Sequence, residues 1–314
     1  MESIQNLKRR LKGVQNIGQI TKAMEFVAAT KMRRSQELAL SSRHYALTAL
    51  RFLGILSELE SVKLPEILDK RKIEKTAFVL VSSDKGLAGS FNGAIIREFE
   101  KFISMGGAKF NDEKNLFIAV GEKSRSYLER KGVRILKSFI RVGDFTTTEE
   151  TKPLSDFLID GYIGKKWDQV LIFSTHFMTA LYQKPLRRQI FPVDFENLKE
   201  TAKEIIPQAG RFAELAKEVP SFFPRGVSKE YLIEPSPEIV LDSLGKHLIE
   251  MQLYHLILEA NASEHAARRV AMKNASDNAE ELASDLTIFY NKSRQAAITR
   301  EITEITAGVE ALRA

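Results

Sequence analysis

The sequence predicts an α/β domain flanked by two long helices that pair as an antiparallel coiled coil. Each end of the chain has apolar residues at alternating spacings of three and four, which is typical of a helix packed along another helix. The middle alternates buried-strand patterns with helical ones, which is typical of a Rossmann-like parallel sheet covered by helices. We therefore expect a coiled-coil helix over 1–60, an α/β domain over 70–235 and a second coiled-coil helix over 236–314.

The first long helix is predicted from Ser3 to about Leu59, because the chain has no proline before Pro65. A helix of more than 50 residues would be roughly 80 Å long at ~1.5 Å per residue. Such a helix needs a partner along most of its length. Its apolar stripe comprises Ile4, Leu7, Leu11, Val14, Ile20 or Thr21, Met24, Ala28 and Met32.

The last helix is predicted to begin at "SPEIVLDSL", with Ser236 as N-cap and Pro237 at the first helical position. No proline follows, so the helix should continue to about Gly308. Small residues in its seam would let the partner helix come close, and its greater length implies that its last turns project beyond the pair. The expected seam comprises Leu282, Leu286, Phe289, Ser293, Ala296 or Ala297, Ile302 and Ile305.

The middle of the chain reads as strands at 76–83, 115–121 and 168–176. Helical patterns lie at 93–103, 122–131 and 153–165. The segment 195–224 has no strand pattern and reads as an inserted loop or short helices, to which we assign no role.

The net charge of +6 is concentrated near the N-terminus, where residues 1–36 carry eight Lys or Arg and two Glu. Such a surface is either a solvated face or a docking surface for an acidic partner. The chain has no cysteine, which excludes disulfides and thiolate metal sites. Its apolar runs are too short to span a bilayer, and we expect no signal peptide.

No motif predicts catalysis or a cofactor. The segment "SSDKGLAGSFN" (82–92) follows a strand, but it matches neither phosphate-loop pattern, and we interpret it as a tight turn or contact loop rather than an anion site. A hydrolytic group could be imagined from Ser82, Ser83, Asp84 and His176, yet G-x-S-x-G is absent. The histidines form no metal-binding motif; they are His44, His176, His247, His255 and His265.

Several segments together resemble the γ-subunit family of F-type ATP synthases, in its bacterial form. They occur in the family's order and cover both ends and the first strand and turn; the central sheet matches in pattern only. The segments are "IGQITKAMEFVAATKMRRSQ" (17–36), "SSDKGLAGSFN" (82–92), "EYLIEPSPEIVLDSL" (230–244), "SEHAARRVAMKNASDNAEEL" (263–282) and "YNKSRQAAITREITEI" (290–305).

The resemblance implies a non-catalytic rotor shaft without cofactor or metal. In that family the paired helices lie inside a hexamer of α and β subunits, and the α/β domain lies beside the c ring together with the ε subunit. Rotation of the ring, driven by protons or sodium ions, is thereby coupled to ATP synthesis or hydrolysis. The implied location is peripheral, at the cytoplasmic face of the bacterial plasma membrane.

The resemblance also implies which residues meet other subunits. Positions that match contacts with the catalytic β subunits are Lys22, Met24, Lys31, Arg33, Arg34, Arg268, Arg294, Gln295, Thr299 and Glu301. Positions that match the foot beside the c ring are Tyr231 and Glu234. Met24 could instead be coiled-coil core, and Arg268 a plain helix charge.

Three positions depart from the family pattern. Arg269 stands where Met is common, Ile233 where an aromatic residue is common, and Ala88 where Cys is common. The extra charge at Arg269 lies near the coupling region, and Ile233 weakens a specific c-ring contact there. The cysteine pair of chloroplast-type redox regulation is also missing.

Two other classes of protein remain open on the residues alone. A basic coiled coil could bind nucleic acid, although the basic cluster at 8–34 contains one aromatic residue, Phe26. An α/β hydrolase with a helical dimerisation arm would also combine these elements.

Overall fold

The computed structural model describes residues 3–41, 65–68, 70–141, 146–193 and 234–312. The chain divides into two compact units, one formed by Met1–Ala28 with Arg269–Ala314 and the other by Ala29–Arg268. Two long helices, α1 (Ile4–Ser41) and α7 (Pro237–Ala311), each contribute to both units. The predicted helix over 42–59 and the insertion at 195–224 lie outside the described residues.

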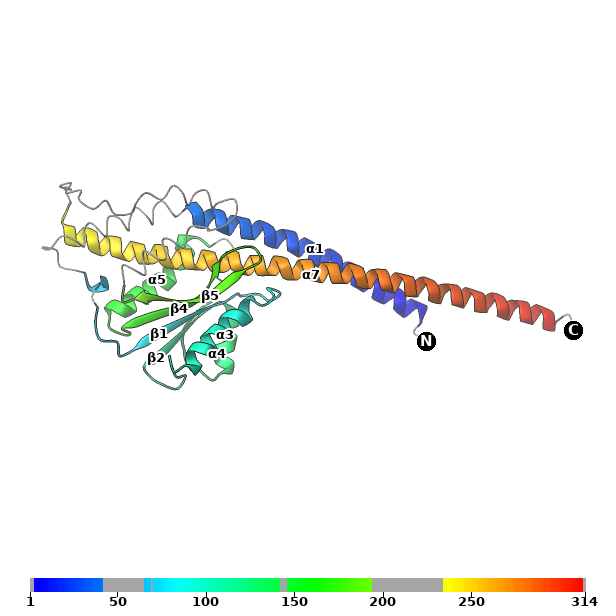
Figure 1. The fold of residues 1–314 in the computed structure, drawn as a ribbon, viewed down its shortest axis with the longest axis horizontal. Helices are drawn as coiled ribbons and strands as arrows, with labels where there is room; N and C mark the ends of the chain where they lie inside the picture. The colour runs from blue at the N-terminus through cyan, green and yellow to red at the C-terminus, as the bar shows by residue number, and fades with distance from the viewer. Residues whose placement is uncertain (1–2, 42–64, 69, 142–145, 194–233, 313–314) are drawn as a thin grey trace. The chain divides into compact units, whose positions relative to one another are not determined.

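In the first unit, α1 and α7 run antiparallel and pack together (Figure 1). The α1 stripe is confirmed, because Leu7 and Ala28 are buried and the positions between them are half-buried, with Thr21 rather than Ile20 in the seam. On α7 the seam follows alternating steps of four and three through Met272, Ser276, Ala279, Ala283, Leu286, Tyr290, Ser293 and Ala297.

The predicted α7 seam is right at Leu286 and wrong at several larger residues. Leu282 and Phe289 are 43% and 51% exposed, and Ile302 and Ile305 are more exposed still. The seam instead follows the face of α7 that carries Ser276, Ala279 and Ala283. These side chains are so small that their spacing does not produce a recognisable hydrophobic pattern in the sequence. Residues 298–309 are all exposed, as expected for last turns that extend beyond α1.

The second unit contains a mixed five-stranded sheet in the order β3-β2-β1-β4-β5. Its strands are β1 (Thr76–Val81), β2 (Asn115–Val120), β3 (Ile135–Phe139), β4 (Gln169–Phe177) and β5 (Gln183–Phe191). The first four are parallel, and β5 is antiparallel to β4. The prediction of a parallel sheet therefore missed the two edge strands, one of which runs in the opposite direction.

Helices cover both faces of this sheet (Figure 1). One face carries α3 (Phe91–Ser104) and α4 (Glu122–Arg130), and the other carries α5 (Thr148–Ile163) and the first part of α7. A short 3₁₀ helix, η1 (Glu66–Leu68), packs on the α5 side. Helix α5 begins five residues before its predicted start, because Thr147 and Glu150 form a capping box that sets its N-terminus.

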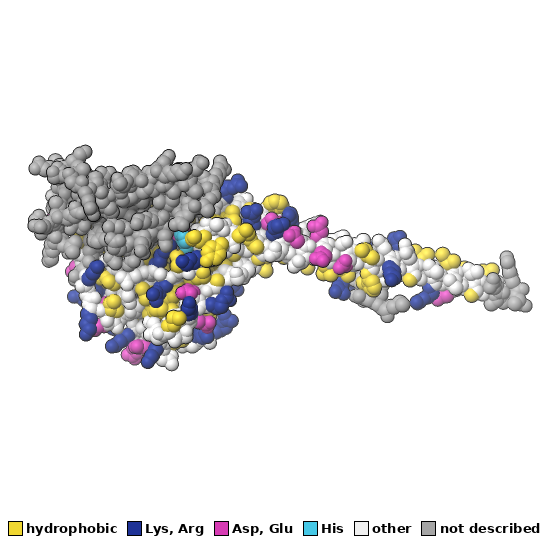
Figure 2. Space-filling view, viewed as in Figure 1, with side chains coloured by type: hydrophobic (Ala, Val, Ile, Leu, Met, Phe, Trp, Pro, Cys, Tyr) yellow, Lys and Arg dark blue, Asp and Glu magenta, His cyan; other side chains and the backbone are white. Residues whose placement is uncertain are grey.

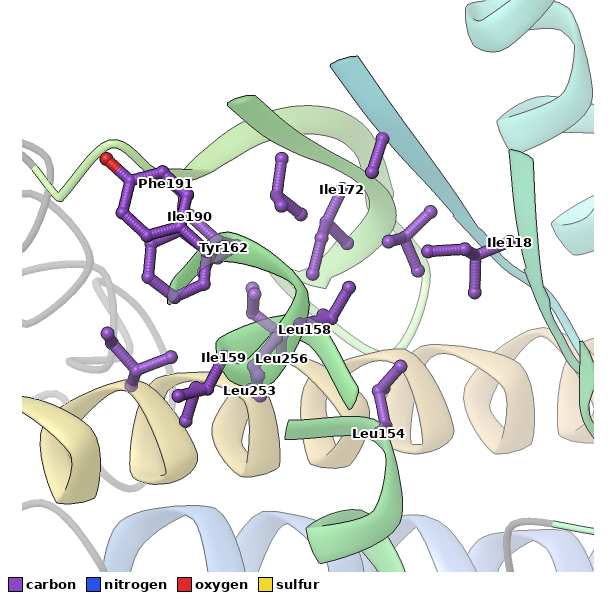
Figure 3. Packing of buried hydrophobic residues seen from close by; sticks show 14 of the residues in the cluster. Ile118, Leu154, Leu158, Ile159, Tyr162, Ile172, Ile190, Phe191, Leu253 and Leu256 are labelled. Atoms are coloured by element: carbon purple, nitrogen blue, oxygen red, sulfur yellow. The ribbon is translucent and has the colours of Figure 1, made fainter. Parts of the chain in front are cut away.

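Alternate side chains of each central strand enter opposite cores, as the pleat requires. On β1, Phe78 and Leu80 join the aromatic core under α3 and α4, whereas Val79 and Val81 join the core under α5 and α7. Figure 3 shows how Leu253 and Leu256 of α7 lie among residues of α5 and the sheet, including a stacked Tyr162–Phe191 pair with centroids 4.4 Å apart. The first part of α7 is thus built into the core of the α/β unit.

Candidate functional site

Within the helix pair, the stretch of α1 around Met24 combines exposed apolar and cationic side chains. Met24 is half-buried in the seam, and Lys22 is exposed. The Lys22 ammonium lies 3.1 Å from Glu25 and 5.5 Å from the centre of the Phe26 ring. Large apolar side chains face outward beside it; they are Ile17, Ile20, Phe26 and Val27, each more than half exposed.

A groove of about 900 Å³ lies where this stretch of α1 meets α7. Lys22 and Phe26 line it from α1, and Asp277 and Glu280 line it from α7. The groove follows from small residues, because Gly18 and Ala279 bring the two helices together there. The groove therefore places the Phe26 ring between the cation of Lys22 and the carboxylates of Asp277 and Glu280. Such a mixed surface suits contact with another polypeptide.

The other predicted contact cations of α1, Lys31, Arg33 and Arg34, belong to the α/β unit, because that unit includes α1 from Ala29 onward. Arg33 and Arg34 are exposed, and the Arg34 guanidinium is 3.9 Å from the Glu37 carboxylate. Lys31 is half-buried. An exposed ion pair of this kind is worth ~0–1 kcal/mol, so the Arg34 guanidinium can exchange its partner at low cost.

Arg268 is directed into its own chain. Its side chain is 10% exposed, and its Nη2 donates to the Gly86 carbonyl at 3.2 Å and to Glu264 at 2.5 Å. Its Nη1 lies 3.2 Å from His265 Nδ1. Arg268 thereby ties α7 to the turn at 82–92, which supports our interpretation of that segment as a contact loop.

Polar side chains of the turn at 82–92 form hydrogen bonds with nearby backbone groups. Ser82 Oγ accepts from the Ser124 amide at 2.6 Å, and Asp84 Oδ1 accepts from the Glu122 amide at 3.0 Å. Ser83 Oγ donates to the Lys85 carbonyl at 2.6 Å. The first two bonds join the segment after β1 to the start of α4, and the third lies within the turn, so these side chains hold the turn in place.

The predicted residues near the C-terminal end of α7 are accessible to a partner. Arg294, Gln295, Thr299 and Glu301 are all exposed, and the Thr299 hydroxyl donates to the Gln295 carbonyl one turn before it. Figure 2 shows hydrophobic side chains along this part of α7, where Ile298, Ile302, Ile305 and Val309 are exposed.

Of the predicted foot residues, Glu234 is exposed just before α7, and Tyr231 lies outside the described residues, as does Ile233. Across the described part of the chain, no three His, Cys, Asp or Glu side chains are arranged so that they could hold a metal ion. Within the same residues, no helix has the length and apolarity needed to cross a membrane.

One buried polar cluster escaped the sequence analysis. Glu259 of α7 contacts His176 of β4, Arg188 of β5 and His255 of α7. Burial by itself would raise the pKa of the Glu259 carboxyl, but His255, His176 and Arg188 outweigh burial and hold that pKa below its ordinary value. The spacing of four between His255 and Glu259 was the only signal available in the sequence.

The fold and these surfaces define a protein with an α/β unit and two long helices, which present a seam, a mixed apolar and cationic face and an exposed end. Such a protein works through contacts with other polypeptides. Comparison with known proteins identifies the family.

A family model described as ATP synthase matches residues 3–312. The ATP synthase gamma chain of Heliobacterium modesticaldum is 36% identical over 316 residues, covering 99% of this chain and 100% of that protein. The gamma chain of Herpetosiphon aurantiacus is 38% identical over 321 residues, with 99% of each covered. The chain therefore belongs to the ATP synthase γ-chain family, the non-catalytic rotor subunits of the central stalk in F-type ATP synthases.

Solved structures agree on the fold. A chain of the Euglena gracilis mitochondrial ATP synthase, in rotational state 3, is similar with a TM-score of 0.64 at 18% identity, covering 98% of this chain and 94% of that one. A chain from the central stalk and c ring of the Tetrahymena thermophila enzyme gives 0.55 at 24% identity, covering 82% and 99%.

Proposed function

We propose that this chain is the shaft that couples ion-driven rotation of a c ring to ATP synthesis and hydrolysis in a hexamer of α and β subunits. The ε subunit would join it at the foot, at the cytoplasmic face of a bacterial plasma membrane. The observation that carries the proposal is α7 itself. It is one uninterrupted helix of 75 residues, its first part belongs to the core of the α/β unit and its last turns are exposed.

The helix pair suits contact with an acidic segment of the β subunits. Lys22, Arg33 and Arg34 are exposed on α1, so their charges are available to carboxylates of a partner. Lys31 would add to the same attraction from its half-buried position. Half-burial of Met24 supports a mixed role, with one side of the thioether packed in the seam and the other open to a neighbour.

The exposed C-terminal end of α7 suits contact with α and β subunits that surround it on all sides. Arg294, Gln295, Thr299 and Glu301 would meet loops of the β subunits through hydrogen bonds and charge. The exposed isoleucines of the same stretch, Ile298, Ile302 and Ile305, would slide along apolar surfaces, since apolar contacts are non-directional. Arg268 would act from within the chain, by holding the turn at Gly86 in place.

At the other end, we assign the contact with the c ring to the region before α7. Glu234 is exposed there, and Tyr231 belongs to the same segment of sequence. The driving ion does not follow from these residues.

Coupling follows from asymmetry. A rod whose sides differ in charge and apolarity presents a different surface to each of the surrounding β subunits in turn. Each surface favours one conformation of its neighbour by the difference in contact free energy, which is a population shift. Rotation then converts these preferences into sequential binding, reaction and release of nucleotide.

The experiment combines the purified full-length chain with α and β subunits of its own organism, followed by size-exclusion chromatography and an ATPase assay. We expect a stable complex that hydrolyses ATP, and no hydrolysis by this chain alone. Turnover by the isolated chain above ~1 s⁻¹, a rate typical of enzymes, would contradict the proposal. So would failure of the chain to enter the complex.

A further inference from the structure

The Glu259 cluster joins α7 to two strands of the sheet at one point. Glu259 Oε2 lies 3.0 Å from His176 Nδ1 on β4 and 3.2 Å from Arg188 Nη1 on β5. Its other oxygen, Oε1, lies 3.1 Å from His255 Nε2, one turn earlier on α7. Both carboxylate oxygens are therefore engaged, and the side chains of Glu259, His176 and Arg188 are at most 10% exposed.

Further polar contacts follow within four residues of α7. The Asn261 side chain donates to Thr146 Oγ1 at 2.7 Å, just before α5. The Ser263 hydroxyl lies 3.4 Å from the Thr175 carbonyl on β4. This short stretch of α7 is thus bonded to three separate segments of the α/β unit.

These bonds differ in kind from the apolar packing around them. Leucine and isoleucine side chains of α7 fill the same core, but apolar attraction has little angular preference. A hydrogen bond weakens steeply when its angle departs from linearity, and a buried charge that loses its partners is strongly destabilised. Rotation of α7 about its own axis would pull Glu259 away from β4 and β5 together.

We propose that Glu259 is a positioning residue that fixes the angular setting of α7 on the sheet, so that torque passes between the foot and the shaft without slip. This inference rests on the proposed rotor function. It assigns to His176 and Arg188 the role of anchoring points on the foot, and to Ser263 and Asn261 a supporting role. Among these residues, Arg188 places a guanidinium 3.2 Å from the buried Glu259 carboxylate.

The test uses the complete, ion-pumping enzyme assembled with Glu259→Gln. The matched control is Glu250→Gln, which neutralises another carboxylate of α7 that lies 3.3 Å from a histidine of the same helix, His247. Two quantities are measured: ions pumped per ATP hydrolysed in vesicles, and angular fluctuation of a bead attached to the foot while the α and β subunits hold the shaft. Thermal variance of that angle is inversely proportional to torsional stiffness.

We expect Glu259→Gln to raise the angular variance and to lower the pumping ratio, each by about twofold or more, since a buried guanidinium then loses its counter-charge. ATP hydrolysis without load should change less than either quantity. Glu250→Gln should match the wild type in all three. If the wild-type complex pumps and Glu259→Gln equals it in variance and ratio, the anchoring role is wrong while the rotor function stands. If the wild-type complex itself does not pump, the rotor function fails.

A reversible cross-link separates anchoring from folding. The chain has no cysteine, so Thr146→Cys with Asn261→Cys introduces a single pair where the two side chains already touch, 2.7 Å apart. In the Glu259→Gln background, oxidation of this pair should restore wild-type variance and pumping, and a reductant should return the defect in the same sample. If Glu259→Gln does not assemble by itself, the oxidised form is assembled first and then reduced. If the angular variance and the pumping ratio are the same with the cysteine pair oxidised and reduced, the proposal is wrong.

Discussion

Gly18 of α1 lies so close to Ala279 of α7 that a Cβ built on the glycine would stand 3.4 Å from the Ala279 Cβ. One turn away, Ser276 Oγ lies 3.4 Å from the Gly18 carbonyl oxygen. Small residues on both helices therefore set the spacing of the pair at this level, beside the groove that Lys22 and Phe26 line.

Replacing Gly18 tests how tight that approach is. Replacing glycine with alanine in a helix usually raises the free energy of unfolding by ~1 kcal/mol. In Gly18→Ala the new methyl group contacts Ala279 at van der Waals distance, so crowding should cancel only part of this stabilisation. Gly13→Ala is the matched control, because nothing lies within 4 Å of its added Cβ and it should show the full gain. Gly18→Leu should loosen the pair. Hydrogen exchange of α1 amides measures all three, and equal protection in the leucine variant would contradict this packing.

Leu286 tests the position of the α7 seam. It is 8% exposed, so Leu286→Asp places a charge in the helix interface and should cost about 3 kcal/mol or more in pairing free energy. Ile288→Asp is the control, since Ile288 is 66% exposed and should tolerate the change. Circular dichroism and hydrogen exchange should show unpaired helices beside an intact α/β unit. Similar effects of the two variants would mean that the seam is misplaced.

Asp168 predicts an acid-dependent contribution to the stability of the α/β unit. Its carboxylate accepts from Arg71 Nε at 2.6 Å and from the amides of Glu74 and Lys75. Burial would raise the pKa of Asp168, but the Lys75 amide, Arg71 and the Glu74 amide outweigh it and lower that pKa. A lowered folded-state pKa stabilises the fold above the unfolded value of about 3.9 and loses this effect as pH falls through the folded value.

Asp168→Asn should therefore cost about 2 kcal/mol at neutral pH, because the half-buried Arg71 guanidinium loses its counter-charge. The difference between the wild type and the variant should stay constant from pH 8 to about 5 and shrink below about 4. Urea unfolding at a series of pH values, followed by tryptophan fluorescence of the nearby Trp167, measures it. A difference that grows on acidification would refute the assignment.

Arg33 and Arg34 test the electrostatic part of the subunit contact. Reversing both to Glu should lower ATP turnover of the assembled complex, and the loss should diminish at high salt because exposed charges are screened. The control reverses two exposed cations of the α/β unit, Lys101 and Arg130. If both double variants behave alike across salt concentrations, the effect is one of net charge rather than of this surface.

The long helices were predictable because their periodicity is repeated many times, and the central strands because their apolar residues form continuous runs. Ser236 and Pro237 also marked the start of α7 correctly, and the Ser236 hydroxyl accepts from the Ile239 amide at 3.4 Å. The edge strands were not predictable in the same way. Strand β5 contains Pro185 and polar side chains on both faces, which is compatible only with an edge position.

The surface residues likewise divide into those that local sequence reveals and those that depend on contacts between distant parts of the chain. Cations such as Arg34 could be found from local sequence, whereas the direction of Arg268 into Gly86 depends on contacts 182 residues apart. The contacts of Glu259 with His176 and Arg188 could not be predicted, because these partners on β4 and β5 come together only after the antiparallel hairpin has formed. Long-range polar pairing leaves no periodic signal in a single sequence.

The central claim is that this chain rotates within its complex. Met105 is 73% exposed on the α/β unit, so Met105→Cys supplies a single attachment point for a bead in a chain without other cysteines. The complex with α and β subunits is fixed to a surface through the α and β subunits, and the bead is followed during ATP hydrolysis. We predict continuous rotation in one direction with three dwell positions per turn. Steady hydrolysis beneath a bead that only fluctuates about one angle would contradict the account.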